Sequence, residues 1–88
     1  MKVKEQFQII NVAEEYLAIP VGKEIDRFQG IVILSEDSYF LLTKMKENRT
    51  KEQLIEMLIK EYDIDSLKAE QEITLFLERL HALGMIED

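Results

Sequence analysis

Gly30-Ile31-Val32-Ile33-Leu34-Ser35-Glu36-Asp37 is the stretch at which the hydrophobic periodicity of the chain changes. Its apolar part is rich in β-branched residues and predicts a strand that extends back to Phe28. From Ser35 onward, apolar residues recur at helical spacing. Ser35 is typical of a helix N-cap, and the two acidic residues after it suit the positive end of the helix dipole. The chain therefore changes from strand to helix at Ser35.

Both faces of this strand are apolar. Successive side chains of a strand point to opposite faces, which groups Phe28, Val32 and Leu34 on one face. The other face carries Ile31 and Ile33. A strand that is apolar on both faces is expected to be central in its sheet or covered at its edge.

Two further strands are predicted upstream, at residues 7–12 and 16–21, where β-branched and aromatic residues are frequent. They flank Ala13-Glu14-Glu15, a polar break of hairpin length. Pro20 cannot donate a ladder hydrogen bond, so we expect it near the end of its strand or on a sheet edge. Gly22-Lys23-Glu24 predicts the turn to the next strand.

Three helices are predicted downstream, over residues 35–46, 50–62 and 65–83, with either Asp65 or Ser66 as the cap of the last. Thr50-x-x-Gln53 is a capping box, and Gly84 is typical of the position just after a helix. Helical spacing assigns the following residues to the inner faces, with the last two folding back on the core: Leu41, Leu42, Met45, Leu54, Ile55, Leu58, Ile59, Ala69, Ile73, Phe76, Leu77, Leu80, Leu83, Met85 and Ile86.

Strands followed by helices in 88 residues predict an α+β fold. The expected architecture is winged-helix-like, with a three-stranded antiparallel sheet followed by a three-helix bundle. Nearly half of the residues, 47%, are apolar and spread along the chain, which is enough for one core. We therefore expect a single domain over residues 1–88.

The sequence lacks the groups that catalysis requires. It has no cysteine, which excludes disulfides and thiolate metal sites, and its one histidine, His81, lies near a helix end. Asp63-x-Asp65 lacks the glycine and the distal glutamate of a calcium loop. No glycine-rich phosphate loop is present. We therefore expect no enzymatic activity, no metal and no cofactor.

The charge of the chain is unevenly distributed. The net charge is −7, of which residues 1–34 carry −1 and residues 35–88 carry −6. An acidic surface repels phosphate backbones and anionic lipids, so neither nucleic acid nor a membrane is an expected partner. No apolar run reaches the length of a membrane span and the N-terminus lacks a signal-peptide core, which favours a cytoplasmic location.

A surface for a peptide or protein partner remains. The strand that ends at Leu34 can expose an edge, which is a template for an incoming strand. On the last predicted helix, Leu75 projects away from the main apolar stripe, near Arg79. Leu75 is either a groove wall or an ordinary exposed leucine, and the residues alone leave both readings open.

The sequence from about Phe7 to Ile86 resembles the PqqD-like family, named for pyrroloquinoline-quinone synthesis protein D and also called RiPP recognition elements. The resemblance is carried, in order and at matching spacing, by Val12-Ala13-Glu14-Glu15-Tyr16, Ile19-Pro20-Val21-Gly22, Gly30-x-x-x-Leu34-Ser35-Glu36, Arg49-Thr50-x-x-Gln53-Leu54, Glu61-Tyr62-Asp63-Ile64-Asp65 and Glu72-Ile73-x-x-Phe76-Leu77-x-x-Leu80-x-x-x-Gly84-Met85-Ile86. The chain departs from the family at four positions, with Ser35 for Asn, Asp37 for Thr, Leu42 for a frequent Trp and Glu72 for Asp.

The resemblance implies a peptide chaperone. Such domains capture the leader of a ribosomally made precursor peptide and present it to a modifying enzyme, often a radical SAM enzyme. The leader adds as a strand to the third strand and lies against the third helix. Carried over to this chain, the peptide-binding residues are Gly30, Ile31, Val32, Ile33, Leu34, Glu72, Leu75, Phe76 and Arg79.

Three points stay open at this stage. Phe76 lies in the main stripe, which favours a core role, so Leu75 and Arg79 are the stronger groove candidates. The alternative functions are a winged-helix DNA-binding regulator and a protein-interaction domain unrelated to peptide modification. The chain is expected to be a monomer or a weak dimer, because an exposed strand edge can pair with itself.

Overall fold

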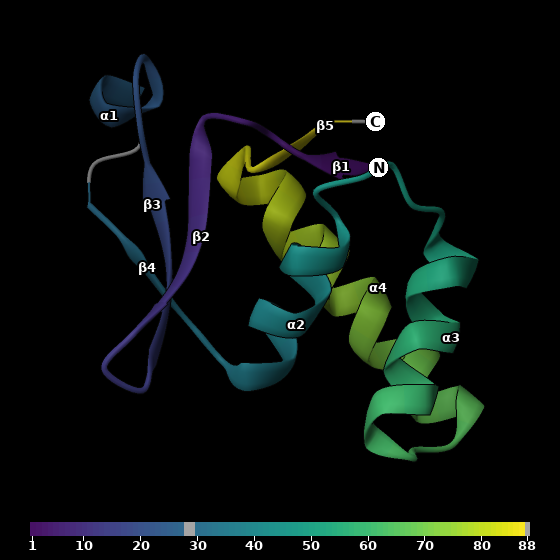
Figure 1. Cartoon of the computed structure of the whole chain (residues 1–88). Coiled ribbons are helices and arrows are strands. Elements are labelled where there is room, and N and C mark those ends of the chain that lie inside the picture. Colours follow the sequence, from purple (N-terminus) through teal and green to yellow (C-terminus); the bar gives the residue numbers. More distant parts are fainter. Residues whose placement is uncertain (28–29, 88) are drawn as a thin grey trace.

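The computed structural model describes residues 1–27 and 30–87 (Figure 1). In chain order the elements are β1 (Lys2–Val3), β2 (Phe7–Val12), β3 (Glu15–Pro20), α1 (Glu24–Arg27), β4 (Val32–Leu34), α2 (Glu36–Lys44), α3 (Lys51–Tyr62), α4 (Ser66–Leu83) and β5 (Ile86–Glu87). The predicted α+β class, with a three-stranded antiparallel sheet followed by three long helices, is confirmed.

The main sheet has the order β2-β3-β4, and both pairs of strands are antiparallel. The hairpin between β2 and β3 turns at Ala13 and Glu14, which both have positive φ, at 48° and 69°. Two such residues match the right-handed twist of the strands that they join. Pro20 is the last residue of β3, as its missing N–H predicts.

Of the two predicted positions of the third strand, central in the sheet or at a covered edge, the structure excludes the central one. β4 is bonded to β3 and, within the described residues, to no other strand, so it is an edge strand. Its outer face is open, since 67% of Ile33 and 54% of Ile31 are exposed. Alternation alone cannot distinguish a covered apolar face from an open one. Phe28, which was assigned to the same strand, lies outside the described residues.

Two short features differ from the prediction. The segment after β3 forms α1 rather than only a turn, and the Glu24 carboxylate, nearly buried, lies 3.5 Å from the Arg27 guanidinium. A second, two-stranded sheet pairs Lys2 with Glu87 and Val3 with Ile86. Two-residue strands from opposite ends of a sequence leave no periodic signal.

The predicted starts of the three long helices are confirmed by the hydrogen bonds of their N-terminal caps. The Ser35 hydroxyl accepts the Ser38 N–H, and the Asp65 carboxylate accepts the Lys68 N–H at 2.8 Å. The capping box forms both of its bonds, with Thr50 Oγ1 accepting from Gln53 N at 3.1 Å and Gln53 Oε1 accepting from Thr50 N at 2.9 Å. These local bonds satisfy N–H groups that the helices cannot satisfy themselves. α2 ends at Lys44, two residues before the predicted end.

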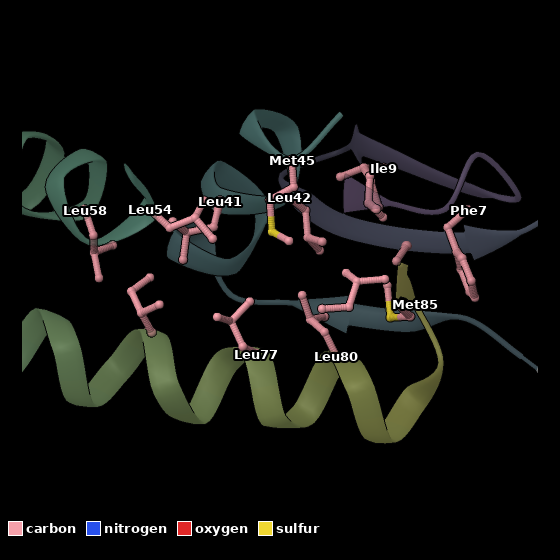
Figure 2. Close-up of a cluster of buried hydrophobic side chains, with 14 of the residues drawn as sticks. Phe7, Ile9, Leu41, Leu42, Met45, Leu54, Leu58, Leu77, Leu80 and Met85 are labelled. Carbon is pink, nitrogen blue, oxygen red and sulfur yellow. The ribbon is translucent and has the colours of Figure 1, made fainter. Parts of the chain in front are cut away.

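The core lies between the inner face of the sheet and the long helices (Figure 2). Leu42, Met45, Leu54, Leu58 and Ile73 are fully enclosed. The predicted return of residues 85 and 86 to the core is confirmed, because both are buried. Within the described residues, no helix is long and apolar enough to cross a membrane.

Candidate functional site

A narrow groove, with a free volume of about 10 Å³, lies between the edge strand β4 and the helix α4. The residues that line it come from β4, α2, α4 and the segment after α4: Val32, Leu34, Ser38, Phe76, Arg79, Leu80, Leu83 and Met85. Six of these eight side chains are hydrocarbon or thioether groups, and one is a guanidinium. The groove therefore offers apolar contact with a single positive charge.

β4 forms one wall of the groove with a side-chain row and a backbone edge. Val32 and Leu34 point inward and pack half-buried against the core. In the described part of the chain, the edge of β4 that faces away from β3 has no strand paired to it. Its N–H and C=O groups are therefore available to another strand.

The opposite wall is one side of α4. Phe76, Arg79 and Leu83 follow one another at spacings of three and four, which places them on one face of a helix. Phe76 packs against the core and also lines the groove, half-buried. The stripe pattern had favoured a core role for Phe76, and the structure places it at the margin of the core.

The structure brings together four of the nine predicted binding residues, namely Val32, Leu34, Phe76 and Arg79. Gly30 lies just before β4, exposed, with a φ of 102° that suits glycine. The side chains of Ile31 and Ile33 are exposed and do not line the groove. Only the backbone of these three residues is placed to take part in strand pairing.

The other two predicted residues, Glu72 and Leu75, line separate hollows. Glu72 faces the start of α2, in a hollow with Glu36, Asp37 and Lys68. Leu75 is 67% exposed and lies beside Thr74 and other residues of its own helix. Leu75 is therefore exposed and outside the lining of this groove, and its part in peptide binding stays a prediction.

Four lining residues were absent from the predicted set: Ser38, Leu80, Leu83 and Met85. Leu80 and Leu83 were assigned to the inner stripe, and Met85 was expected to fold back on the core. A residue at the edge of a core stripe can also form the floor of a groove. The position of Leu80 and Leu83 in the stripe was therefore the signal that could have identified them. Ser38 carries no such signal, because its place depends on how α2 meets β4.

Tyr62, the last residue of α3, lies near the acidic residues at the start of α2. Burial raises the pKa of the Tyr62 phenol above its ordinary value, and the charges of Glu36, Asp37 and Glu61 raise it further. The Tyr62 ring also meets the Phe40 ring edge-on, with the centroids 5.9 Å apart. The apolar Phe40 ring and the three carboxylates all disfavour a negatively charged phenolate at this position.

The raised pKa of Tyr62 predicts a loss of stability in alkali. An unfolded tyrosine loses its proton near pH ~10. The folded chain holds this proton to higher pH, so the unfolded state binds fewer protons there and the free energy of unfolding falls as pH rises. Urea denaturation across this range should show a steeper fall for the wild type than for Tyr62→Phe. Parallel curves for the two proteins would contradict the assignment.

No catalytic or metal arrangement appears in the part of the chain that the structure describes. No three His, Asp or Glu side chains are grouped to hold a metal ion there. His81 lies on the surface in the last turn of α4, with Nδ1 2.9 Å from the carbonyl oxygen of Leu77. The groove offers a ligand apolar contact and the Arg79 guanidinium.

An open strand edge beside a helix, on a winged-helix-like scaffold, defines a small α+β binding domain. The family model described as coenzyme PQQ synthesis protein D (PqqD) matches residues 15–86, and the chain belongs to this family. A search of curated proteins gave no match.

Among solved structures, the chain is similar to one described as TbiB1 in complex with the TbiA(beta) leader peptide. The TM-score is 0.78 at 16% sequence identity, and the match covers 99% of this chain and 95% of that chain. At this identity the likeness is one of fold. It spans both the sheet and all three long helices.

Proposed function

We propose that this chain is a non-catalytic adaptor that binds the leader segment of a ribosomally synthesised precursor peptide. In this role it presents the rest of the peptide to a modifying enzyme. The observation that carries the proposal is the unpaired edge of β4 beside the groove formed with α4. A bound segment gains backbone hydrogen bonds from the strand edge and side-chain contacts from the helix.

The bound peptide adds as a strand along residues 30–34. Alternate side chains of an added strand point to the same face, so every second leader residue enters the apolar groove. Phe76 gives the groove an aromatic wall, and Arg79 offers a charge-assisted hydrogen bond to an acidic leader residue. Leu75 and Glu72 border this face of α4 and make peripheral contacts with longer leaders.

The family and the fold both support a peptide partner. Members of this family are linked by name to coenzyme PQQ synthesis, and TbiB1, which shares the fold, was solved with a leader peptide. The modifying enzyme is proposed to be a radical SAM enzyme. Residues 1–88 are proposed to form one peptide-binding domain, which works with this enzyme in the cytoplasm. A DNA-binding role is not favoured, since α4 carries Lys68 and Arg79 against three glutamates.

NMR of the labelled chain, titrated with the precursor peptide whose gene lies beside its own, tests this proposal. Amide shifts should be confined to residues 30–34 and to the face of α4 that carries Phe76 and Arg79. A peptide with the leader removed serves as the control and should give no shifts. Shifts with duplex DNA at low salt, and none with the leader, would overturn the proposal.

A further inference from the structure

A second pocket lies at the β2 edge of the molecule, on the other side of β3 from the groove. It is lined by residues of β1, the start of β2 and the turn after α2: Lys2, Val3, Lys4, Glu5, Phe7, Ile9 and Lys46. We call its three lysines, Lys2, Lys4 and Lys46, the lysine patch. The patch and the peptide groove share no lining residue.

The lysine patch is held by backbone hydrogen bonds between segments that are distant in sequence. Val3 N donates to Met45 O at 2.8 Å, and Arg49 N donates to Met1 O at 2.8 Å. Lys4 N donates to Met85 O at 2.9 Å. The three ammonium groups are thus carried by a fixed scaffold formed by β1 and the turn after α2.

The charge of the patch is only partly neutralised. Lys2 lies 3.9 Å from the Glu5 carboxylate and opposite Glu87 in the β1–β5 pair. In residues 1–27 and 30–87, the side chains of Lys4 and Lys46 form no ion pair. Residues 1–5, 44–51 and 86–87 together carry six basic and three acidic side chains, whereas the rest of the chain has a net charge of −10.

The floor of the pocket is apolar. Val3, Phe7 and Ile9 are buried beneath the lysines. Ammonium groups above an apolar floor suit a carboxylate side chain that has an apolar neighbour. A long polyanion or an anionic membrane is a poor fit, because it extends beyond the patch and meets the acidic remainder of the surface.

We propose that the lysine patch docks an acidic segment on the surface of the modifying enzyme while the leader occupies the groove. The identity of this partner rests on the proposed function. An adaptor must hold its peptide and its enzyme at the same time, which requires two surfaces that do not overlap. The lysine patch and the groove have separate linings, and among the described residues the patch brings positive charge together on an acidic molecule.

The double variant Lys4→Glu/Lys46→Glu tests this proposal against a control with the same change in net charge, Lys23→Glu/Lys60→Glu. The control lysines are exposed and lie in the turn after β3 and in the last turn of α3. For each protein, the dissociation constant is measured for the labelled leader and for the purified modifying enzyme encoded beside it. Both dissociation constants are measured at low and at moderate salt concentration, after NMR amide spectra confirm that each variant is folded.

The patch variant should bind the enzyme at least ~10-fold more weakly and with a smaller salt dependence, since it removes two cations and adds two anions. Its leader affinity should stay within about twofold of the wild type, as should both affinities of the control. Equal weakening by the two variants, or unchanged enzyme binding by the patch variant, overturns the proposal. If the wild type fails to bind the leader, the proposed function is refuted. That result is distinct from the outcomes that test the lysine patch.

Discussion

Phe76→Ala is expected to weaken leader binding by about ten- to a hundredfold, which corresponds to about 1.4–2.8 kcal/mol. Among the described residues, the ring is the one aromatic group in the lining of the groove, and it lies on the wall opposite the free edge of β4. Aromatic side chains at the centre of an interface supply much of its binding energy, because they bury a large rigid surface. Fluorescence anisotropy of a labelled leader measures the loss.

Stability must be separated from binding, since Phe76 also packs against the core. We expect this variant to lose some stability, and binding is therefore measured where circular dichroism shows a folded chain. Leu67→Ala is the matched control on the same helix, because Leu67 is exposed and lies outside the groove lining. Its leader affinity should stay within about twofold of the wild type. Similar losses in the two variants would contradict the assignment of the groove wall.

The elements that the sequence predicted well are those specified by local chemistry. α4 begins after Asp65 and ends before Gly84, and both flanking residues act through bonds to their immediate neighbours. The hairpin turn at residues 13–14 is local in the same sense. Capping and turn preferences are readable from one segment at a time, so these boundaries were predicted to within one or two residues.

The features that were missed depend on distant parts of the chain. The position of β4 in the sheet is set by which strand lies beside it, and its apolar outer face fits a central strand equally well. The pairing of β1 with β5 joins residues at the two ends of the sequence. Neither leaves a periodic signal, because each is decided by tertiary contacts.

The residues of the candidate site also differ in whether the sequence alone or tertiary packing determines their position. The family resemblance predicted that Phe76 and Arg79 lie on one face of the helix, and both line the groove. Leu75 lies one helical turn before Arg79 but is exposed and outside the groove lining, because the lining depends on the rotation of α4 against the sheet. Ser38 enters the lining only because α2 starts directly after β4. The resemblance thus indicated the helix that forms the wall, and tertiary packing determines which of its residues line the groove.

Leu42→Ala is expected to have the largest effect on stability, lowering the free energy of unfolding by about 2–5 kcal/mol. The Leu42 side chain has no exposed surface, and it lies in the cluster between the sheet and α4 (Figure 2). Deleting its methyl groups removes buried apolar surface and leaves a cavity that the neighbouring helices fill incompletely. In a domain of 88 residues this is a large fraction of the total stability.

The same position tests the departure from the family, in which tryptophan is frequent. Leu42 is fully enclosed, so Leu42→Trp must displace its neighbours and should also destabilise the chain, by about 1–3 kcal/mol. Leu75→Ala, the same substitution as Leu42→Ala at an exposed helical site, should change stability by less than ~0.5 kcal/mol. Urea denaturation followed by circular dichroism measures all three variants. If Leu42→Ala matched Leu75→Ala, or if Leu42→Trp stabilised the chain, the core around α2 would be packed differently from the structure described.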